Sequence, residues 1–285
     1  MYSRQRSGRS SAAMLAAAMT ALLAGGVSAA LAASPPMVAV PLGEQDAARI
    51  QAAARLPNLD GVWEPLQADV FDITTANAPG GARVRAPFTR AYQAKYVATM
   101  AQVLRDLKVD PLSECQPLGL LRMMSLTGHY EFAVTPGQVW IFSGTAPGPR
   151  SSGAQTRRIY TDGRANLKDD DLFPTYTGNS VGHWEGDTLV IKTVGLNEGM
   201  FIDRTGAMLS GDANVTERIR LVSPNVLQDQ FTIEDKTALT RPWVVTRSWQ
   251  RLPAGTAISD DSCLGKRVNP SKIADAAAAR AAQKK

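Results

Sequence analysis

Alternation of apolar and polar residues dominates the chain from position 128 to position 251. This alternation is typical of strands with one buried and one exposed face. Short turn signals, among them Pro136-Gly137 and Glu185-Gly186, separate the alternating segments, and connections of this length join neighbouring antiparallel strands. The segments predicted to be strands are 59–63, 128–135, 138–144, 155–161, 181–183, 188–196, 215–222, 226–234 and 243–251.

A different period marks the segment 87–107, which follows the first predicted strand. The apolar residues that recur there at steps of three and four are Tyr92, Tyr96, Met100 or Val103, and Leu107. Such steps indicate one amphipathic helix, inserted between the first strand and the others.

A sheet of this many strands usually closes on itself, because closure removes its exposed edges. About eight strands enclose a space that can hold one small ligand. We therefore predict an all-β fold, an antiparallel meander that closes into a barrel and carries the inserted helix.

The first 33 residues have the layout of a signal peptide. Arg4, Arg6 and Arg9 precede an apolar run over 12–31 that ends in small residues. The alternative is a membrane anchor, but the run is rich in Ala, Gly and Ser, which contribute little to insertion. We expect a periplasmic or secreted protein with a cleaved signal peptide and no stable membrane anchor after processing.

The rest of the chain divides by composition into three parts. A lead-in rich in Ala and Pro covers 34–56, the barrel domain covers 57–264, and a basic Ala-rich tail covers 265–285. The whole chain has 31 basic and 26 acidic residues, but the barrel domain and lead-in hold 22 basic and 25 acidic residues. The basic excess thus belongs to the chain ends, which argues against a nucleic-acid partner.

Two cysteines, Cys115 and Cys263, are present. An exported protein in an oxidising compartment commonly pairs two such thiols, so we expect a disulfide between them. Two unpaired buried thiols or a catalytic thiol are the alternatives.

Gly61-Val62-Trp63, on the first predicted strand, resembles the G-x-W signature of lipocalin and wider calycin barrels. The resemblance implies a lipocalin-like barrel in which the tryptophan closes the floor and an arginine of the last strand packs over its ring. Arg247 is the matching candidate. The inserted helix at 87–107 departs from the lipocalin pattern.

A second resemblance covers nearly all of the mature chain and is to a family of exported, uncharacterised bacterial proteins. It implies a shared exported β fold and supplies no catalytic residue. The motifs that carry it are Cys115-Gln116-Pro117-Leu118-Gly119, RRIYTDGR over 157–164, GHWEGDTLVI over 182–191, Glu217-Arg218 and Thr240-Arg241-Pro242-Trp243.

Turn positions set the pairing register of the last three strands. They place Phe231 opposite Val245, Asp229 opposite Arg247, and Glu217 opposite Phe231. We therefore predict a partly buried cluster of Glu217, Asp229 and Arg247 on an inner face with Phe231, Trp243 and Trp249.

This charged cluster has two interpretations. Arg247 neutralises both acids while covering Trp63, which makes the cluster structural. Alternatively one carboxyl, Glu217 or Asp229, is kept protonated by the other and serves as a general acid or base towards a ligand.

A second candidate site lies on the first hairpin, where His129, Glu131, Trp140 and Phe142 share a face. His129 beside Glu131 could be a base and its orienting partner in an aromatic pocket. On the next strand, Arg158 could bind an anionic group and Tyr160 could relay a proton. The alternatives are that His129 is a strand-end residue and that Arg157 and Arg158 alternate across an edge or rim strand.

No phosphate loop, dinucleotide fingerprint or nucleophile elbow is present, and the two histidines and two cysteines lack zinc-ligand spacing. We expect no cofactor and no metal. The predicted function is binding of a small apolar or aromatic molecule inside the barrel. The alternatives are a cofactor-independent lyase, isomerase or dehydratase acting on an aromatic compound, and a structural envelope interaction protein. The oligomeric state stays open.

Overall fold

The computed structural model describes residues 44–67, 71, 85–106, 109–114, 116–144 and 154–259. The expected signal peptide, the basic tail and both cysteines lie outside these residues, so the predicted cleavage and disulfide stay predictions. Among the described residues, no helix combines the length and the apolar character needed to cross a membrane.

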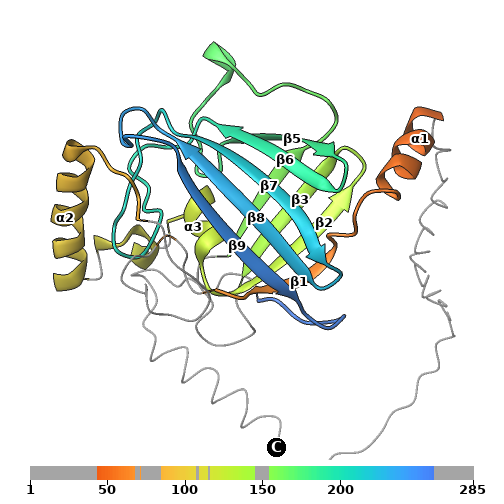
Figure 1. Ribbon diagram of the computed structural model, residues 1–285, viewed down its shortest axis with the longest axis horizontal. Helices are drawn as coiled ribbons and strands as arrows, with labels where there is room; N and C mark the ends of the chain where they lie inside the picture. The colour runs from red at the N-terminus through yellow and green to blue at the C-terminus, as the bar shows by residue number, and fades with distance from the viewer. Residues whose placement is uncertain are drawn as a thin grey trace, which may run out of the picture. The chain divides into compact units, whose positions relative to one another are not determined.

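Nine strands form one closed barrel, in which each strand pairs with the next along the chain and the last pairs with the first (Figure 1). This confirms the predicted all-β barrel, whereas its lipocalin-like character stays a prediction. The strands are β1 (Gly61–Pro65), β2 (His129–Thr135), β3 (Gln138–Gly144), β4 (Gln155–Tyr160), β5 (Asn179–Glu185), β6 (Thr188–Val194), β7 (Asn214–Ser223), β8 (Val226–Glu234) and β9 (Trp243–Arg251).

One neighbouring pair departs from the predicted antiparallel meander. β4 and β5 run parallel and share a single pair of facing residues, Tyr160 and Val181. The connection between them spans 161–178 and includes the short helix η4 (Asp169–Asp171). A segment of that length allows β5 to run in the same direction as β4, whereas a tight hairpin would have reversed the chain.

The inserted helix is α2 (Arg90–Arg105), within the predicted 87–107. Thr89 caps its first turn by accepting a hydrogen bond from the Tyr92 amide. Tyr92, Tyr96 and Val103 form its buried face, as their spacing predicted. A second helix, α1 (Glu44–Ala53), lies in the predicted lead-in.

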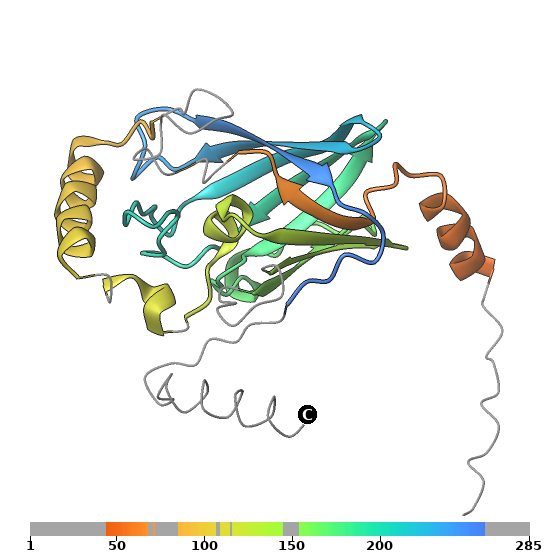
Figure 2. The same ribbon diagram turned by 90° about the horizontal axis from the view of Figure 1, so that it is seen from below.

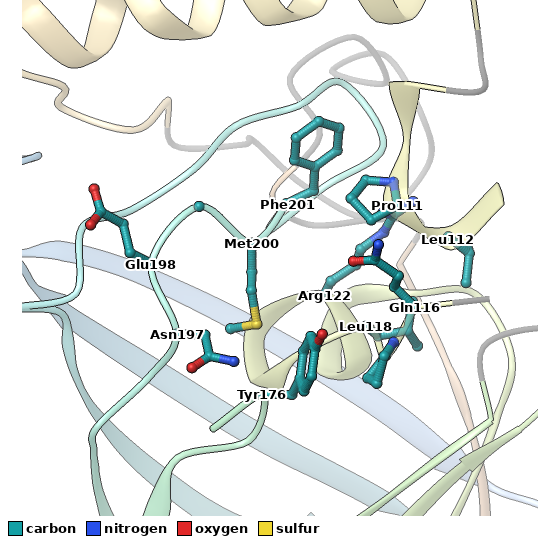
Figure 3. Close-up of a pocket in the computed structure, with 12 residues that line it drawn as sticks. Pro111, Leu112, Gln116, Leu118, Arg122, Tyr176, Asn197, Glu198, Met200 and Phe201 are labelled. Atoms are coloured by element: carbon teal, nitrogen blue, oxygen red, sulfur yellow. The ribbon is translucent and has the colours of Figure 1, made fainter. Parts of the chain in front are cut away.

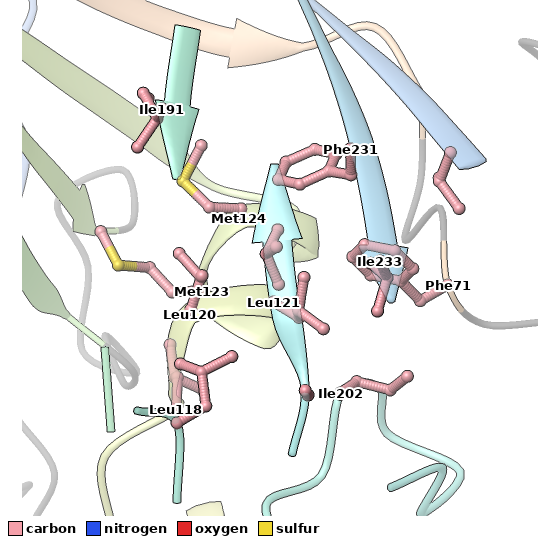
Figure 4. Close-up of a cluster of buried hydrophobic side chains, with 14 of the residues drawn as sticks. Phe71, Leu118, Leu120, Leu121, Met123, Met124, Ile191, Ile202, Phe231 and Ile233 are labelled. Carbon is pink, nitrogen blue, oxygen red and sulfur yellow. The ribbon is translucent and has the colours of Figure 1, made fainter. Parts of the chain in front are cut away.

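Helix α3 (Leu120–Ser125), preceded by the single turn η3 (Pro111–Glu114), was not predicted. All six residues of α3 are buried, and its leucines and methionines join the core formed by the barrel strands (Figures 2 and 4). Four of its six residues are apolar, and the two polar ones, Arg122 and Ser125, have hydrogen-bond partners, so the whole helix can be buried. Six residues are too few for a helical period to show in the sequence.

Tyr130 and Arg247, two residues of the barrel strands, attach α3 to the barrel wall through hydrogen bonds. The Tyr130 hydroxyl lies 2.7 Å from the carbonyl oxygen of Met123 and 2.8 Å from that of Leu126. Arg247 donates to the carbonyls of Met124 and Leu126, the latter at 2.6 Å. A cation at a helix C-terminus stabilises the unpaired carbonyls there.

Candidate functional site

The predicted charged cluster lies inside the barrel. Glu217, Asp229 and Arg247 are each 0% exposed. All three predicted facing pairs, Phe231 with Val245, Asp229 with Arg247 and Glu217 with Phe231, are present. The turns therefore predicted correctly which side chains face inward.

The partner of Glu217 is Arg157, a residue that the sequence analysis did not place in the cluster. Two Arg157 nitrogens donate to the two Glu217 oxygens at 2.8 and 2.5 Å. Arg157 also donates to the hydroxyls of Ser180 and Thr193. The signal that could have revealed it is the strand alternation, because Arg157 shares a face with the fully buried Ile159.

Arg247 neither neutralises the two acids nor covers Trp63, so both expectations were wrong. Its guanidinium is directed to the carbonyls of α3 instead. Arg251 covers Trp63 at 4.0 Å from the ring centroid. The reason is register, because Trp63 faces Arg251 across β1 and β9. An arginine of the last strand therefore does pack over the tryptophan, but it is not the one chosen from the sequence.

Asp229 has no hydrogen-bond partner for either carboxyl oxygen among the described residues. Burial, followed by the negative charge of Glu217, raises the pKa of Asp229 well above its ordinary value. The protonated form is thus favoured, as the second interpretation of the cluster required. Neither Asp229 nor Glu217, however, lines either of the cavities described below.

The aromatic residues predicted to line a ligand space instead fill the barrel. Phe231, Trp243 and Trp249 are at most 1% exposed. The ring of Phe71 packs edge-on against Phe231 and Trp243, with centroids 5.8 and 5.2 Å apart. Together with α3 they belong to one buried core, and the expected ligand site among these side chains stays a prediction (Figure 4).

The first-hairpin candidates lie on the outer face of the barrel. The neighbouring residues on the same strands are buried and face inward, namely Tyr130, Phe132, Val139 and Ile141. Glu131 is exposed. His129 lies beside the carboxylate of Glu64, with Nε2 and Oε2 4.0 Å apart. His129 and Glu131 therefore do not lie in an enclosed aromatic pocket formed with Trp140 and Phe142.

Arg158 and Tyr160 also belong to the outer face. The Arg158 guanidinium lies 4.2 Å from the centroid of the Trp140 ring and donates to the Tyr160 hydroxyl at 3.1 Å. Arg158 therefore contacts Trp140 and Tyr160 on the outer surface, away from Glu217 and Asp229. The two predicted sites are thus separated by the barrel wall.

A cavity of about 240 Å³ lies beside α3, and we call it the α3 cavity (Figure 3). One wall is formed by α3 and the segment that leads into it, the other by the connection after β6, and Tyr176 comes from the connection between β4 and β5. Its lining residues are Pro111, Leu112, Gln116, Pro117, Leu118, Arg122, Tyr176, Asn197, Glu198, Gly199, Met200 and Phe201.

Three uncharged polar side chains, those of Gln116, Tyr176 and Asn197, direct their polar ends towards the space between the two walls (Figure 3). Within the described residues, no hydrogen bond satisfies any of these three side chains. Glu198 points away from the same space (Figure 3). Hydrogen-bonding capacity is therefore available at the cavity.

The charge on the cavity wall is neutralised locally. Arg122 is 4% exposed and forms a two-pronged ion pair with Asp110, with both nitrogen–oxygen distances 2.5 Å. Leu118, Met200 and Phe201 supply the apolar part of the lining. Sequence reasoning missed this cavity, although Gln116-Pro117-Leu118-Gly119 belongs to a motif that it singled out.

Metal binding has no structural support among the described residues, where no group of three or more His, Cys, Asp or Glu side chains could hold an ion. His183 and Arg218 both contact Glu185, at 3.1 and 2.9 Å. The hydrogen bonds from Arg218 and then His183 lower the pKa of Glu185. This exposed trio forms a surface network across β5 and β7.

No protein-family model matches the chain, and no curated protein is significantly similar to it. The motif-based family resemblance therefore stays a prediction. Among solved structures, two mutants of the fluorescent protein UnaG are similar, at 12% and 11% identity. The matches cover 68% of this chain and 96% and 95% of the other chains, with TM-scores of 0.33 and 0.32. At these scores the similarity adds nothing to the functional argument, and the barrel rests on its own strand pairing.

Proposed function

We propose that the protein binds a small, mainly apolar or aromatic molecule with an uncharged polar group, and that it does so in the α3 cavity. The observation that carries the proposal is the convergence of Gln116, Tyr176 and Asn197 on this cavity without hydrogen-bond partners among the described residues. Pockets that combine an apolar lining with a few convergent polar groups are typical ligand sites.

The charge and size of the cavity favour the class of ligand. Asp110 already occupies the Arg122 guanidinium, so an anionic ligand would meet no unpaired cation among the described lining residues. A volume of about 240 Å³ is below the range of about 300–1,000 Å³ that holds drug-sized molecules. A compound with a single ring is therefore the expected size. The signal peptide expected at 1–33 would let the protein meet such compounds outside the cytoplasm.

Phenol is a suitable first probe, because it combines one aromatic ring with one hydroxyl group. Isothermal titration calorimetry should detect phenol binding, and benzoate, which has the same ring with a charged group, should bind more weakly. Tyr176→Phe should weaken phenol binding about three- to tenfold, the effect of losing one hydrogen bond. Tyr160→Phe, an equivalent change on the outer face, should leave it unchanged.

Tighter binding of benzoate than of phenol would contradict the uncharged polar group. Equal phenol affinity in wild type and Tyr176→Phe would contradict this cavity as the site. Native mass spectrometry of protein purified from its own cells would then show whether any small molecule is retained elsewhere.

A structural role in the cell envelope is the second candidate, and the filled barrel interior favours it. In that case the charged cluster stabilises the fold and the α3 cavity has no ligand. Absence of binding for phenol and for a panel of related aromatic compounds would support this candidate. The acid–base enzyme alternative is not proposed, because Glu217 and Asp229 are both 0% exposed.

A further inference from the structure

A small apolar recess lies behind the α3 cavity. It has a volume of about 20 Å³, and the residues that line both spaces are Leu118, Arg122, Asn197, Met200 and Phe201. The residues that line the recess alone are Gly119, Leu120, Leu121, Leu196, Ile202, Leu209, Ser210 and Ala213. The residues that line the recess alone are apolar except for Ser210, so the recess is the more apolar of the two spaces.

Met200 stands where the two spaces meet. Its side chain is unbranched and flexible, which allows it to adopt several shapes at little cost. It also fits closely against Gly119, where an added Cβ would lie 2.8 Å from both the Met200 Sδ and Cε atoms. Gly119 has a φ of 76°, a conformation that other residues rarely adopt. Because glycine has no Cβ, the Met200 side chain can pack directly against its backbone.

We propose that Met200 is a movable gate between the α3 cavity and the recess, and that the ligand has an uncharged polar head and a short apolar tail. The inference rests on the proposed function and refines it. The head binds Gln116, Tyr176 and Asn197, and the tail displaces the Met200 side chain and enters the recess. A recess of about 20 Å³ is too small for a tail while Met200 keeps its present position.

A series of para-alkylphenols separates head binding from tail binding, because the phenol head is constant and the tail grows by one CH₂ at a time. Calorimetry should show affinity rising about fourfold for each CH₂ that leaves water. The rise should stop once the recess is full. Phenol, para-cresol, para-ethylphenol, para-propylphenol and para-butylphenol make up the series.

Variants of the recess should change the tail length at which the rise in affinity stops, with each affinity compared to that of the same variant for phenol. Ala213→Val fills the recess and should end the rise at a shorter tail. Met200→Ala removes the gate and should extend it to a longer tail. Val97→Ala, on the exposed side of α2, is the control and should leave the whole series unchanged.

Ala213 is 2% exposed, so the added methyl groups of valine could prevent folding. Leu209→Ala enlarges the recess from a different side and gives a second test, with an extended rise expected. Circular dichroism establishes that each variant is folded before titration.

The two proposals fail in different ways. Failure of phenol itself to bind contradicts the proposed function. If the wild-type protein binds every para-alkylphenol with the same affinity as phenol, both the gate and the recess are contradicted. A length dependence that Met200→Ala, Ala213→Val and Leu209→Ala all leave unchanged also contradicts the gate, because the tail then lies elsewhere.

Discussion

Two buried aspartates show how much the surroundings of a residue decide its role. Asp235 is 3% exposed, and its oxygens accept hydrogen bonds from Ser210, Thr237 and Ala238. Asp229 is fully buried without a hydrogen-bond partner among the described residues. Hydrogen bonds favour a carboxylate, whereas burial without them favours the neutral acid.

Asp229→Asn should therefore make stability less dependent on pH. Because the folded-state pKa of Asp229 is raised, the folded protein holds this proton more tightly than the unfolded chain does. The free energy of unfolding then falls as pH rises from the unfolded pKa, near 4, through the raised folded pKa. The asparagine variant lacks this loss and should match or exceed wild type at the upper end of the range.

Urea unfolding at a series of pH values measures this difference. Asp235→Asn is the matched control and should lose about 1–3 kcal/mol, because amide NH groups replace an acceptor that several donors need. A larger pH-dependent loss in Asp229→Asn than in wild type would show that the folded protein needs the Asp229 charge.

At the scale of elements, α3 depends on its attachment to the barrel wall. Tyr130→Phe removes the hydroxyl that lies against the carbonyls of Met123 and Leu126. The expected loss of stability is about 0.5–1.5 kcal/mol, the net value of one hydrogen bond. Hydrogen exchange of the α3 amides should accelerate more than that of the strands.

Tyr92→Phe provides the control, because this buried tyrosine of α2 has no hydroxyl hydrogen bond within the described residues. It should leave exchange in α3 unchanged. Equal acceleration in all elements of the Tyr130→Phe variant would mean that α3 opens only when the whole barrel unfolds.

Elements with a strong local signal were predictable from the sequence, and those that depend on distant partners were not. Alternation and turn residues placed the strands, and for β7 to β9 they also gave the facing pairs, including Asp229 with Arg247. Helix α3 is stable only inside the barrel, so no local pattern revealed it. The α3 cavity was missed for the same reason, because its two walls, near Gln116 and Asn197, are far apart in the chain.

Arg157 shows the limit for single residues. Its inward direction follows from alternation with Ile159, but its partner does not, because Glu217 is 60 positions away on another strand. The choice of Arg247 over Arg251 as the cover of Trp63 failed for a related reason. That choice needed the register between β1 and β9, which no turn connects.

At the scale of the whole molecule, Arg157 connects four strands. It lies on β4 and reaches Ser180 on β5, Thr193 on β6 and Glu217 on β7. Arg157→Met should cost about 3–5 kcal/mol, because Glu217 is left as an unpaired buried charge. The double variant Arg157→Met with Glu217→Met should recover most of this loss, because the unpaired charge is gone.

Unfolding in urea measures both variants, and hydrogen exchange shows where the barrel loosens. Exchange should accelerate in β4 and β5 in the double variant as well, because the contact between Arg157 and Ser180 is absent in both. Full protection of these two strands in the double variant would show that the arginine contributes charge balance alone.

The parallel contact between β4 and β5 gives this arginine its importance. Elsewhere neighbouring strands are joined by a ladder of backbone pairs, but Tyr160 and Val181 form the single pair here. Side chains, above all Arg157, thus connect β4 to β5, whereas main-chain hydrogen bonds connect the other neighbouring strands. If β4 and β5 separate, the barrel opens there and exposes two unpaired strand edges, with which a neighbouring molecule could pair.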